Sequence, residues 1–355
     1  MQPSFSRYLL IFAGSLVAVV LLAWAYVASA PMAFMESGYA AWAAKSTMLR
    51  ECRLGQVTFF GDSRLEAGVI PAALPVEASN FGLAAGTPIE TYSAVTRALR
   101  CPVLPRQAVI ALVPEHFGPL SKFFWLLSLR YGFIGPGELI QTEDWAARLG
   151  DTQTLATPTP DGLGGRVRDI LYAARFPSLS FGSLVQGRVF GRYGSNMQRY
   201  DEALASRGWA KYAGGEMVPA DRAELFEPTK LQRAAFEAAV TQLRQRGVEV
   251  ALLVMPFSEA QRLPDAMASG YLRYLADVVQ RIPGVRLVDA VVPVWPDRLF
   301  ADRAHFDAAG AHLFSERLAA CFRDGLLQPG CDLAWRGVAA EAGSSVLEVQ
   351  QQSHR

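Results

Sequence analysis

The chain has 355 residues, of which 51% are hydrophobic and 19% charged, and its formal net charge is +1. Globular domains usually carry about 25% charged residues, so this chain is unusually apolar, and intrinsic disorder is excluded as its main character. The near-zero net charge excludes a bulk attraction to nucleic acid. The 30 glycines and 21 prolines show no period, which excludes a collagen-like chain.

The excess hydrophobicity is concentrated at the N-terminus. Residues 8–35 contain no charged side chain, and residues 8–30 are almost continuously apolar. At about 1.5 Å per residue, such a helix covers roughly 34 Å, enough to cross the core of a bilayer. Arg7 and the terminal amine place positive charge on the flank that we expect to face the cytoplasm. We therefore expect residues 1–30 to form a cytoplasmic stub and a transmembrane anchor.

Two other interpretations of this segment compete with an anchor. A cleaved signal peptide has an apolar core of about 7–15 residues, shorter than this one. The sequence Ala28-Ser29-Ala30 resembles a cleavage site, but Pro31 follows and makes a poor substrate for the peptidase. A buried core helix is the other alternative, and the uncharged run is too long for it. Anchor and signal peptide both place residues from about 36 onward outside the cytoplasm.

The chain contains four cysteines, too few for a disulfide-built scaffold and without the spacing of a zinc site. Cys52 and Cys101 each lie just before a strand-like run, so neighbouring parallel strands would place both at the same edge of a sheet. An exported domain permits disulfides, and we expect a Cys52–Cys101 bridge. Cys321 and Cys331 close a short loop and would form a second bridge. The alternative is four buried free thiols.

After the anchor, residues 31–50 are rich in Ala and Met and predict a helical neck. Short apolar runs that end at glycine, proline or polar residues then alternate with amphipathic helices. This alternation predicts a parallel sheet with helices on both faces. We expect strands at 57–60, just before 80–82, at 108–112, 248–254 and 285–288, and helices at 88–99, 229–246, 264–281 and 308–323.

A long segment interrupts this pattern. Residues 115 to about 227 are far more than one crossover needs, and we expect a cap inserted into a main domain of residues 51–330. Between Arg166 and Arg199 the insertion has six arginines and one acid. This stretch is either a solvated basic face or a surface that meets the membrane, a membrane partner or a polymer. We expect residues 331–355 to form a disordered tail.

Residues suited to catalysis follow three of the predicted strands. Functional groups gather at the carboxyl ends of parallel strands. Ser63 follows the first strand and suits a nucleophile whose backbone N–H faces a developing oxyanion. A serine nucleophile needs a base, and the base needs an orienting acid. His305 follows Asp302 by three residues, close enough for the carboxylate to accept a hydrogen bond from the imidazole. The sequence therefore predicts a Ser63–His305–Asp302 triad.

In this combination and order the sequence resembles the SGNH (GDSL) hydrolase family. Gly61-Asp62-Ser63 matches the nucleophile block of that family, and Asp302 to His305 matches its last block. The resemblance covers about residues 55–113 and 229–325. It implies an α/β, flavodoxin-like three-layer domain with a parallel sheet, preceded here by one transmembrane helix.

The segment 80–88 resembles the second block of the family, which offers a backbone N–H to the oxyanion hole. Ala85 or Gly86 occupies that place, with Gly82 as a third candidate and Asn80 at the start of the block. The resemblance thus implies an oxyanion hole built from the backbone N–H groups of Ser63 and of Ala85 or Gly86.

The third block departs from the family pattern. An asparagine side chain is expected after the third strand, but the chain has Val113-Pro114-Glu115-His116 there. One oxyanion donor is typically worth about 10²–10³ in rate, so its loss would slow hydrolysis unless another group, such as His116, substitutes. His116 is equally compatible with a loop histidine bonded to backbone. Asp62 is expected to fix the turn, and Arg64 either forms a salt bridge or binds an anionic substrate.

The single anchor, the missing asparagine and the large insertion narrow the resemblance. They are similar to membrane-anchored SGNH proteins that work with membrane-bound O-acyltransferases in alginate and cellulose acetylation and in D-alanine transfer to teichoic acid. This implies an acyl group carried on Ser63 and passed to a sugar hydroxyl. The implied partners are a polysaccharide or acyl-sugar and a membrane-bound O-acyltransferase or polymer synthase, with no nucleic acid, cofactor or metal. The implied location is the bacterial inner membrane, single-pass, with the catalytic domain in the periplasm.

Two other functions remain open from the sequence. One is a general esterase or lipase of the cell envelope, which uses the same triad on other esters. The other is a catalytically degenerate domain that binds polysaccharide or scaffolds an acylation complex. The complete triad favours an enzyme, whereas the missing asparagine favours the degenerate domain.

Overall fold

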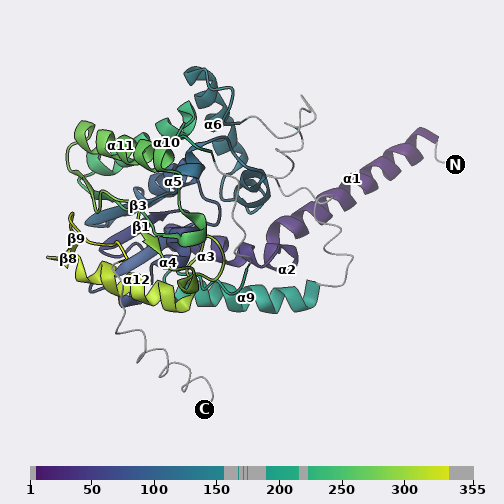
Figure 1. Ribbon diagram of the computed structural model, residues 1–355. Coiled ribbons are helices and arrows are strands. Elements are labelled where there is room, and N and C mark those ends of the chain that lie inside the picture. Colours follow the sequence, from purple (N-terminus) through teal and green to yellow (C-terminus); the bar gives the residue numbers. More distant parts are fainter. Residues whose placement is uncertain are drawn as a thin grey trace, which may run out of the picture.

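The computed structural model describes residues 5–155, 167, 171, 174, 189–215 and 223–335 (Figure 1). Its first element is helix α1 (Phe5–Ser29), which extends away from the rest of the described chain. The mean hydropathy of α1 reaches 2.4, and only 6% of its most apolar window is buried. The chain therefore begins with a helix that is long and apolar enough to span a membrane, as the sequence predicts.

The core of the fold is a five-stranded sheet in the order β2-β1-β3-β4-β6, in which all neighbouring strands are parallel. The register sets Gly61 beside Gly82 and Ala111, so the first three strands end at one level. The predicted mixed α/β class with a parallel sheet is confirmed. The strands are β1 (Val57–Gly61), β2 (Ala78–Gly82), β3 (Gln107–Ala111), β4 (Glu249–Leu252) and β6 (Val285–Leu287).

Helices cover both faces of the sheet (Figure 1), and an apolar cluster lies on each face. On one face, Phe60 and Phe81 of the sheet pack against helices that contribute Ile89, Phe236 and Tyr271. The other face packs against the short α4 and against α12. The predicted helices agree with the observed ones to within about three residues. They are α5 (Pro88–Ala98), α10 (Lys230–Gln245), α11 (Asp265–Arg281) and α12 (Ala308–Ala320), and the structure adds the short α4 (Ser63–Gly68).

The segment predicted as a neck is helical but belongs to the core. Short α2 (Pro31–Phe34) leads into α3 (Gly38–Arg50), whose Trp42 and Met48 are buried within the first apolar cluster. Helix α9 (Val189–Ala205) packs along α2 and α3, and the Asn196 side chain donates to the Met35 carbonyl at 3.0 Å. The packed domain therefore begins before residue 51.

The insertion between β3 and α10 is partly described. Phe124 and Trp125 are buried while Phe123 is 45% exposed, so the apolar run at 123–127 serves mainly as core. Most of the basic stretch from Arg166 to Arg199 lies outside the described residues. The remaining elements are η1 (Pro71–Ala73), η2 (Pro114–Phe117), η3 (Phe124–Leu129, a π-helix), α6 (Pro136–Leu149), β5 (Phe257–Ser258), η5 (Glu259–Gln261), β7 (Val294–Trp295), η6 (Asp297–Leu299), β8 (Phe322–Arg323) and β9 (Leu326–Leu327).

Both predicted disulfides are present. The Cys52–Cys101 bridge joins the segment after α3 to the segment after α5, and Cys321–Cys331 joins the end of α12 to the C-terminal segment. Beyond the second bridge, Leu333 is fully buried and its carbonyl accepts from the indole of Trp295 at 2.9 Å. The tail predicted to be disordered from residue 331 therefore packs through residue 335, and residues 336–355 lie outside the described part.

Candidate active site

Ser63 is the first residue of α4, directly after the end of β1. The preceding Asp62 caps this helix, because its carboxylate accepts the N–H of Arg64 at 2.9 Å. The other carboxylate oxygen accepts the N–H of Val113, just past β3, at 2.7 Å. Asp62 therefore fixes the turn between two adjacent strand ends, as expected from the sequence. A Cβ at Gly61 would lie 1.8 Å from the Ala111 carbonyl oxygen, so this turn requires glycine.

Asp302 and His305 form a bonded pair in the loop before α12. The imidazole Nδ1 lies 2.8 Å from Asp302 Oδ2, and the carboxylate also accepts the backbone N–H of Ala304 and of His305. Burial alone would raise the pKa of Asp302, but the hydrogen bonds from His305 and Ala304 outweigh burial and lower the pKa to about 2. Asp302 is therefore a carboxylate at neutral pH and is placed to orient the ring. This predicted contact is confirmed.

The His305 loop lies against α4, the helix that begins at Ser63. The His305 ring stacks on Tyr212 with a centroid distance of 4.0 Å, and the Tyr212 hydroxyl donates to Glu66 of α4 at 2.9 Å. Further along, a Cβ at Gly68 would lie 3.1 Å from the Phe306 ring. Within the described residues His305 Nε2 is buried without a hydrogen-bond partner, and no hydrogen bond joins it to Ser63. In free enzymes such contacts are often formed only when substrate binds.

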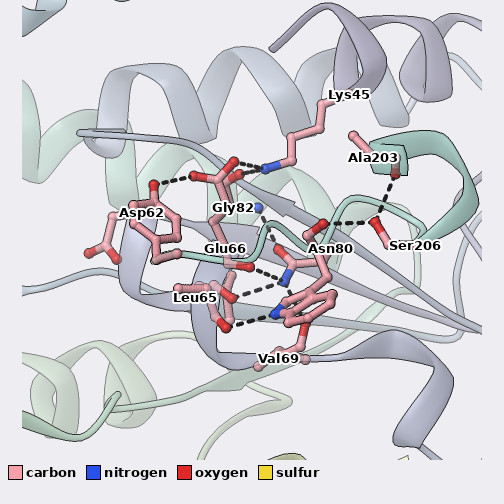
Figure 2. Close-up of polar contacts among 12 residues, drawn as sticks. Lys45, Asp62, Leu65, Glu66, Val69, Asn80, Gly82, Ala203 and Ser206 are labelled. Carbon is pink, nitrogen blue, oxygen red and sulfur yellow. Dashed lines mark hydrogen bonds and ion pairs between the residues drawn. The ribbon is translucent and has the colours of Figure 1, made fainter. Parts of the chain in front are cut away.

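Asn80 is a structural residue at the start of the second block. Its side-chain amide donates to the carbonyls of Leu65 and Val69, at 2.9 and 2.8 Å, and its oxygen accepts the N–H of Gly82 at 2.9 Å (Figure 2). These bonds attach the end of β2 to α4. Asn80 therefore supports the shape of the loop, and the N–H of Gly82 is already engaged.

Two of the predicted oxyanion donors remain after the backbone bonds are assigned. The Gly86 N–H donates to the Leu83 carbonyl at 2.8 Å, which removes Gly86 from the set together with Gly82. The N–H groups of Ser63 and Ala85 have no acceptor among the described residues. Ala85 has a φ of +56°, a left-handed conformation that is uncommon for a residue with a side chain. Ser63 and Ala85 are the two donors that the loop leaves available.

His116 lies in η2, next to the Asp62 turn. Its Nδ1 is 3.5 Å from Asp62 Oδ2, beyond a good hydrogen bond, so the two groups are neighbours and not a tight pair. Arg64 is 6% exposed, and its guanidinium stacks 4.0 Å over the Phe257 ring and donates to the Pro256 carbonyl. Arg64 thus packs against the segment that follows β4.

Sequence reasoning missed three polar residues beside the site: Lys45 of α3, Glu66 of α4 and Tyr212. The Lys45 ammonium is fully buried and donates to Glu66 at 2.5 Å and to the Gly82 carbonyl (Figure 2). Burial lowers the pKa of Lys45, and the Glu66 charge opposes that shift. One signal was available, because Lys45 is the only charged residue between Glu36 and Arg50.

A cavity of about 620 Å³ lies between α3, α9 and residues 209–213. It reaches the site because Glu66, Ala84 and Tyr212 line it, and Trp42 and Trp209 supply aromatic walls. Its size suits a small ligand or a few units of a polymer. Among the described residues, no group of three His, Cys, Asp or Glu side chains is arranged to hold a metal ion.

Comparisons of the chain with protein-family models, with curated proteins and with solved structures find no match. The interpretation of the site therefore depends on its geometry. That geometry consists of a serine at a strand-to-helix turn, an aspartate–histidine pair packed against the same helix, and two backbone N–H groups that have no acceptor in the part of the chain that the structure describes.

Proposed function

We propose that this chain is a membrane-anchored serine acyl esterase or O-acyltransferase of the SGNH type. Its substrate would be an exopolysaccharide, such as cellulose or alginate, outside the cytoplasm. The observation that carries the proposal is the Asp302–His305 pair, bonded at 2.8 Å and stacked through Tyr212 against the helix that begins at Ser63. An oriented imidazole and a partly buried serine at a strand end, packed against the same helix, are the groups that serine acyl transfer needs.

The sheet supports this assignment. The order β2-β1-β3-β4-β6 corresponds to the flavodoxin-like arrangement, in which ligands bind at the carboxyl ends of the strands. Ser63 follows β1 at that edge, and Ala85 lies in the loop after β2. An SGNH domain is expected to use the same edge.

The proposed reaction has two acyl-transfer steps. The Ser63 oxygen attacks the carbonyl carbon of the acyl ester while His305 Nε2 takes the hydroxyl proton, and Asp302 stabilises the imidazolium. The oxyanion accepts hydrogen bonds from the N–H groups of Ser63 and Ala85. Collapse breaks the ester C–O bond, and the leaving alcohol takes the proton from His305. A sugar hydroxyl or water, deprotonated by His305, then attacks the acyl-serine; the acyl C–O bond to Ser63 breaks, and the Ser63 oxygen takes the proton back from His305.

The N-terminal helix and the two disulfides support the proposed location. Helix α1 is suited to anchor the protein in the bacterial inner membrane, and two disulfides are compatible with a periplasmic domain. The proposed partners are a membrane-bound O-acyltransferase or a polymer synthase, which would supply the acyl group or the polymer.

A second candidate is a non-catalytic subunit that binds polysaccharide or scaffolds an acylation complex. It is favoured by the segment after β3, where Val113 to His116 replace the expected asparagine. Within the described residues His305 Nε2 also has no hydrogen-bond partner, so the histidine is not bonded to Ser63. Catalysis distinguishes the two candidates directly.

The deciding experiment compares hydrolysis of an aryl acetate by the full chain in detergent and by its Ser63→Ala variant. We expect Ser63→Ala to lower kcat by about 10⁴-fold or more, because the nucleophile is removed. The His305→Gln variant should be similarly impaired, whereas His312→Gln, an exposed position on α12, serves as the matched control.

The outcomes separate the functions. Equal rates for the wild type and Ser63→Ala would disprove the nucleophile and leave the scaffold. A rate that rises with longer acyl chains would favour an envelope lipase. Transfer of acetyl from the aryl ester to an added cello- or alginate oligosaccharide, detected by mass spectrometry, would support the transferase over the esterase.

A further inference from the structure

Residues 209–215 lie across the site as a strap that joins α4 to the histidine loop. Three hydrogen bonds attach the strap to α4: the Trp209 indole donates to the Ala67 carbonyl at 2.8 Å, the Ala210 N–H to the Glu66 carbonyl at 3.2 Å, and the Tyr212 hydroxyl to the Glu66 carboxylate. At its other end, a Cβ at Gly215 would lie only 2.5 Å from Asp302 Cβ. The strap therefore contacts both the nucleophile helix and the acid of the triad.

The strap is held by a buried charge pair. Glu66 is 2% exposed and Lys45 fully buried, and the Lys45 ammonium donates to both Glu66 and the carbonyl of Gly82. Buried charges are costly unless paired, so this pair fixes Glu66 in one orientation. Burial first, and then the Glu66 charge, raises the pKa of Tyr212 well above its ordinary value, so the phenol remains a donor. These contacts connect Gly82, at the end of β2, to the His305 ring. They pass through Lys45, Glu66 and Tyr212.

The contact with Tyr212 matters to the His305 ring because the other restraint on the ring, its hydrogen bond to Asp302, comes from the same loop. Asp302 holds Nδ1 from only three residues away within the same loop. A ring held at one nitrogen can still swing about that bond, which moves Nε2. The Tyr212 ring lies over the imidazole at an interplanar angle of 19° and limits this motion. The Nε2 atom is the one that must meet Ser63.

We propose that Tyr212 is a positioning residue, which through Glu66 and Lys45 fixes the His305 ring relative to the helix that carries Ser63. This inference rests on the proposed function, in which His305 is the base. A displacement of about 1 Å in a catalytic group can cost about 10²-fold in rate. Helix α3, which follows the membrane anchor, thereby contributes Lys45 to the positioning of His305.

The first test measures aryl acetate hydrolysis by Tyr212→Leu and Tyr212→Phe in the full chain. Tyr212→Leu removes the ring and should lower kcat and kcat/KM together by about 10–100-fold, as expected when an interaction serves the transition state. Tyr212→Phe keeps the ring and loses the bond to Glu66, and should fall between the wild type and Tyr212→Leu. The matched controls are Tyr200→Leu and Tyr200→Phe, because the Tyr200 hydroxyl bonds Thr47 at 3.0 Å away from His305.

The second test reads the ring geometry without using activity. The four histidines are labelled with ¹³C at the ring Cε1, and His305→Gln assigns the signal. The Tyr212 ring current should shift the His305 signal upfield. Tyr212→Leu should abolish that shift, Tyr212→Phe should keep most of it, and the Tyr200 variants should leave it unchanged.

The outcomes are distinct from those for the proposed function. Wild-type kcat in both Tyr212 variants, while Ser63→Ala is inactive, would overturn the positioning role and leave the proposed function intact. An unshifted His305 signal in the wild type would overturn it as well. If Tyr212→Leu does not fold, wild-type kcat and an unchanged signal in Tyr212→Phe would decide against the proposal. A Ser63→Ala variant as active as wild type would reject the proposed function, whereas the ring-current test would still report whether Tyr212 fixes His305.

Discussion

Two regions of the molecule meet at the candidate site, and they are built from contacts of different range. Several bonds in the sheet-edge loops, residues 61–63, 82–87 and 302–307, join residues two or three apart, such as Asp62 to Arg64 and Asp302 to His305. The N-terminal helical layer, made of α2, α3, α9 and residues 206–215, is joined by contacts across long stretches of sequence. The Tyr212–Glu66 bond, for example, spans 146 residues.

This difference indicates that the sheet-edge loops and the helical layer have different roles. Turns with short-range bonds place the reactive groups at the sheet edge, and the bond from Val113 to Asp62 holds two of the strand ends together. The helical layer contributes no group to the proposed triad, but Lys45 and Tyr212 contact the loop end at Gly82 and the ring of His305. The chemistry is thus predicted to depend on the sheet-edge loops, and stability and alignment on the helical layer.

The largest expected effect comes from Asp302→Asn, a change confined to a sheet-edge loop. The amide can no longer act as the charged acceptor for His305, and we expect kcat for aryl acetate hydrolysis to fall by about 10⁴-fold. The melting temperature at neutral pH should fall by only a few degrees, because Asp302 is partly exposed and its charge contributes about 1–2 kcal/mol. The control is Asp297→Asn, whose carboxylate accepts the Ala260 N–H away from His305. Full activity in Asp302→Asn would remove the loop from the mechanism.

Lys45→Met tests the helical layer, and the effect should appear in stability. The substitution leaves the Glu66 carboxylate buried without its partner, and we expect the free energy of unfolding to fall by about 3–5 kcal/mol. Lys45→Met combined with Glu66→Leu should recover most of that loss, because an apolar pair of similar volume avoids the buried charge. Urea unfolding followed by fluorescence measures both, with the exposed Lys122→Met as control. A loss below about 1 kcal/mol would contradict a tightly paired Lys45.

The same difference in the sequence separation of contacting residues explains which features the sequence could predict. The strands, most helices, the Asp302–His305 contact and the cap at Asp62 follow from local patterns, and the structure has them. Lys45 and Glu66 could not be paired in advance, since nothing local links α3 to α4. The available oxyanion donors were narrowed only by backbone bonds such as Gly86 to Leu83.

Residues 31–50, predicted as a neck, show a second limit of prediction from the sequence. The Ala- and Met-rich composition of residues 31–50 predicts a helical neck, but it does not reveal what packs against that helix. The structure buries Trp42 and Lys45 of this helix and packs the helix along α9, which lies about 150 residues later in the chain. Only tertiary packing decides whether such a helix is a separate neck or part of the core.

The two disulfides give a smaller, graded test of the same comparison. Cys52–Cys101 closes a separation of 49 residues and attaches the end of α3 to the sheet domain, whereas Cys321–Cys331 closes only 10. Chain-entropy arguments give about 4 kcal/mol for the longer loop and about 3 kcal/mol for the shorter. Paired Cys→Ser variants, compared by urea unfolding, should follow that order. A larger loss from Cys321→Ser/Cys331→Ser would show that the C-terminal segment matters more than the α3 attachment.

The smallest expected effect concerns acid stability at Asp302. Its pKa of about 2 lies below the ordinary value of 3.8, so its ionised form is favoured in the folded state. The contribution is therefore present above pH 4 and is lost as the pH falls from 4 towards 2. Since the side chain is partly exposed, we expect wild type to lose about 1–2 kcal/mol more than Asp302→Asn over that range. Melting temperatures at pH 5, 4, 3 and 2 measure the difference, with the exposed Asp324→Asn as control. Parallel curves for wild type and Asp302→Asn would mean that the Asp302–His305 bond aligns the ring without stabilising the fold, and would sharpen the separation between the sheet-edge loops and the helical layer.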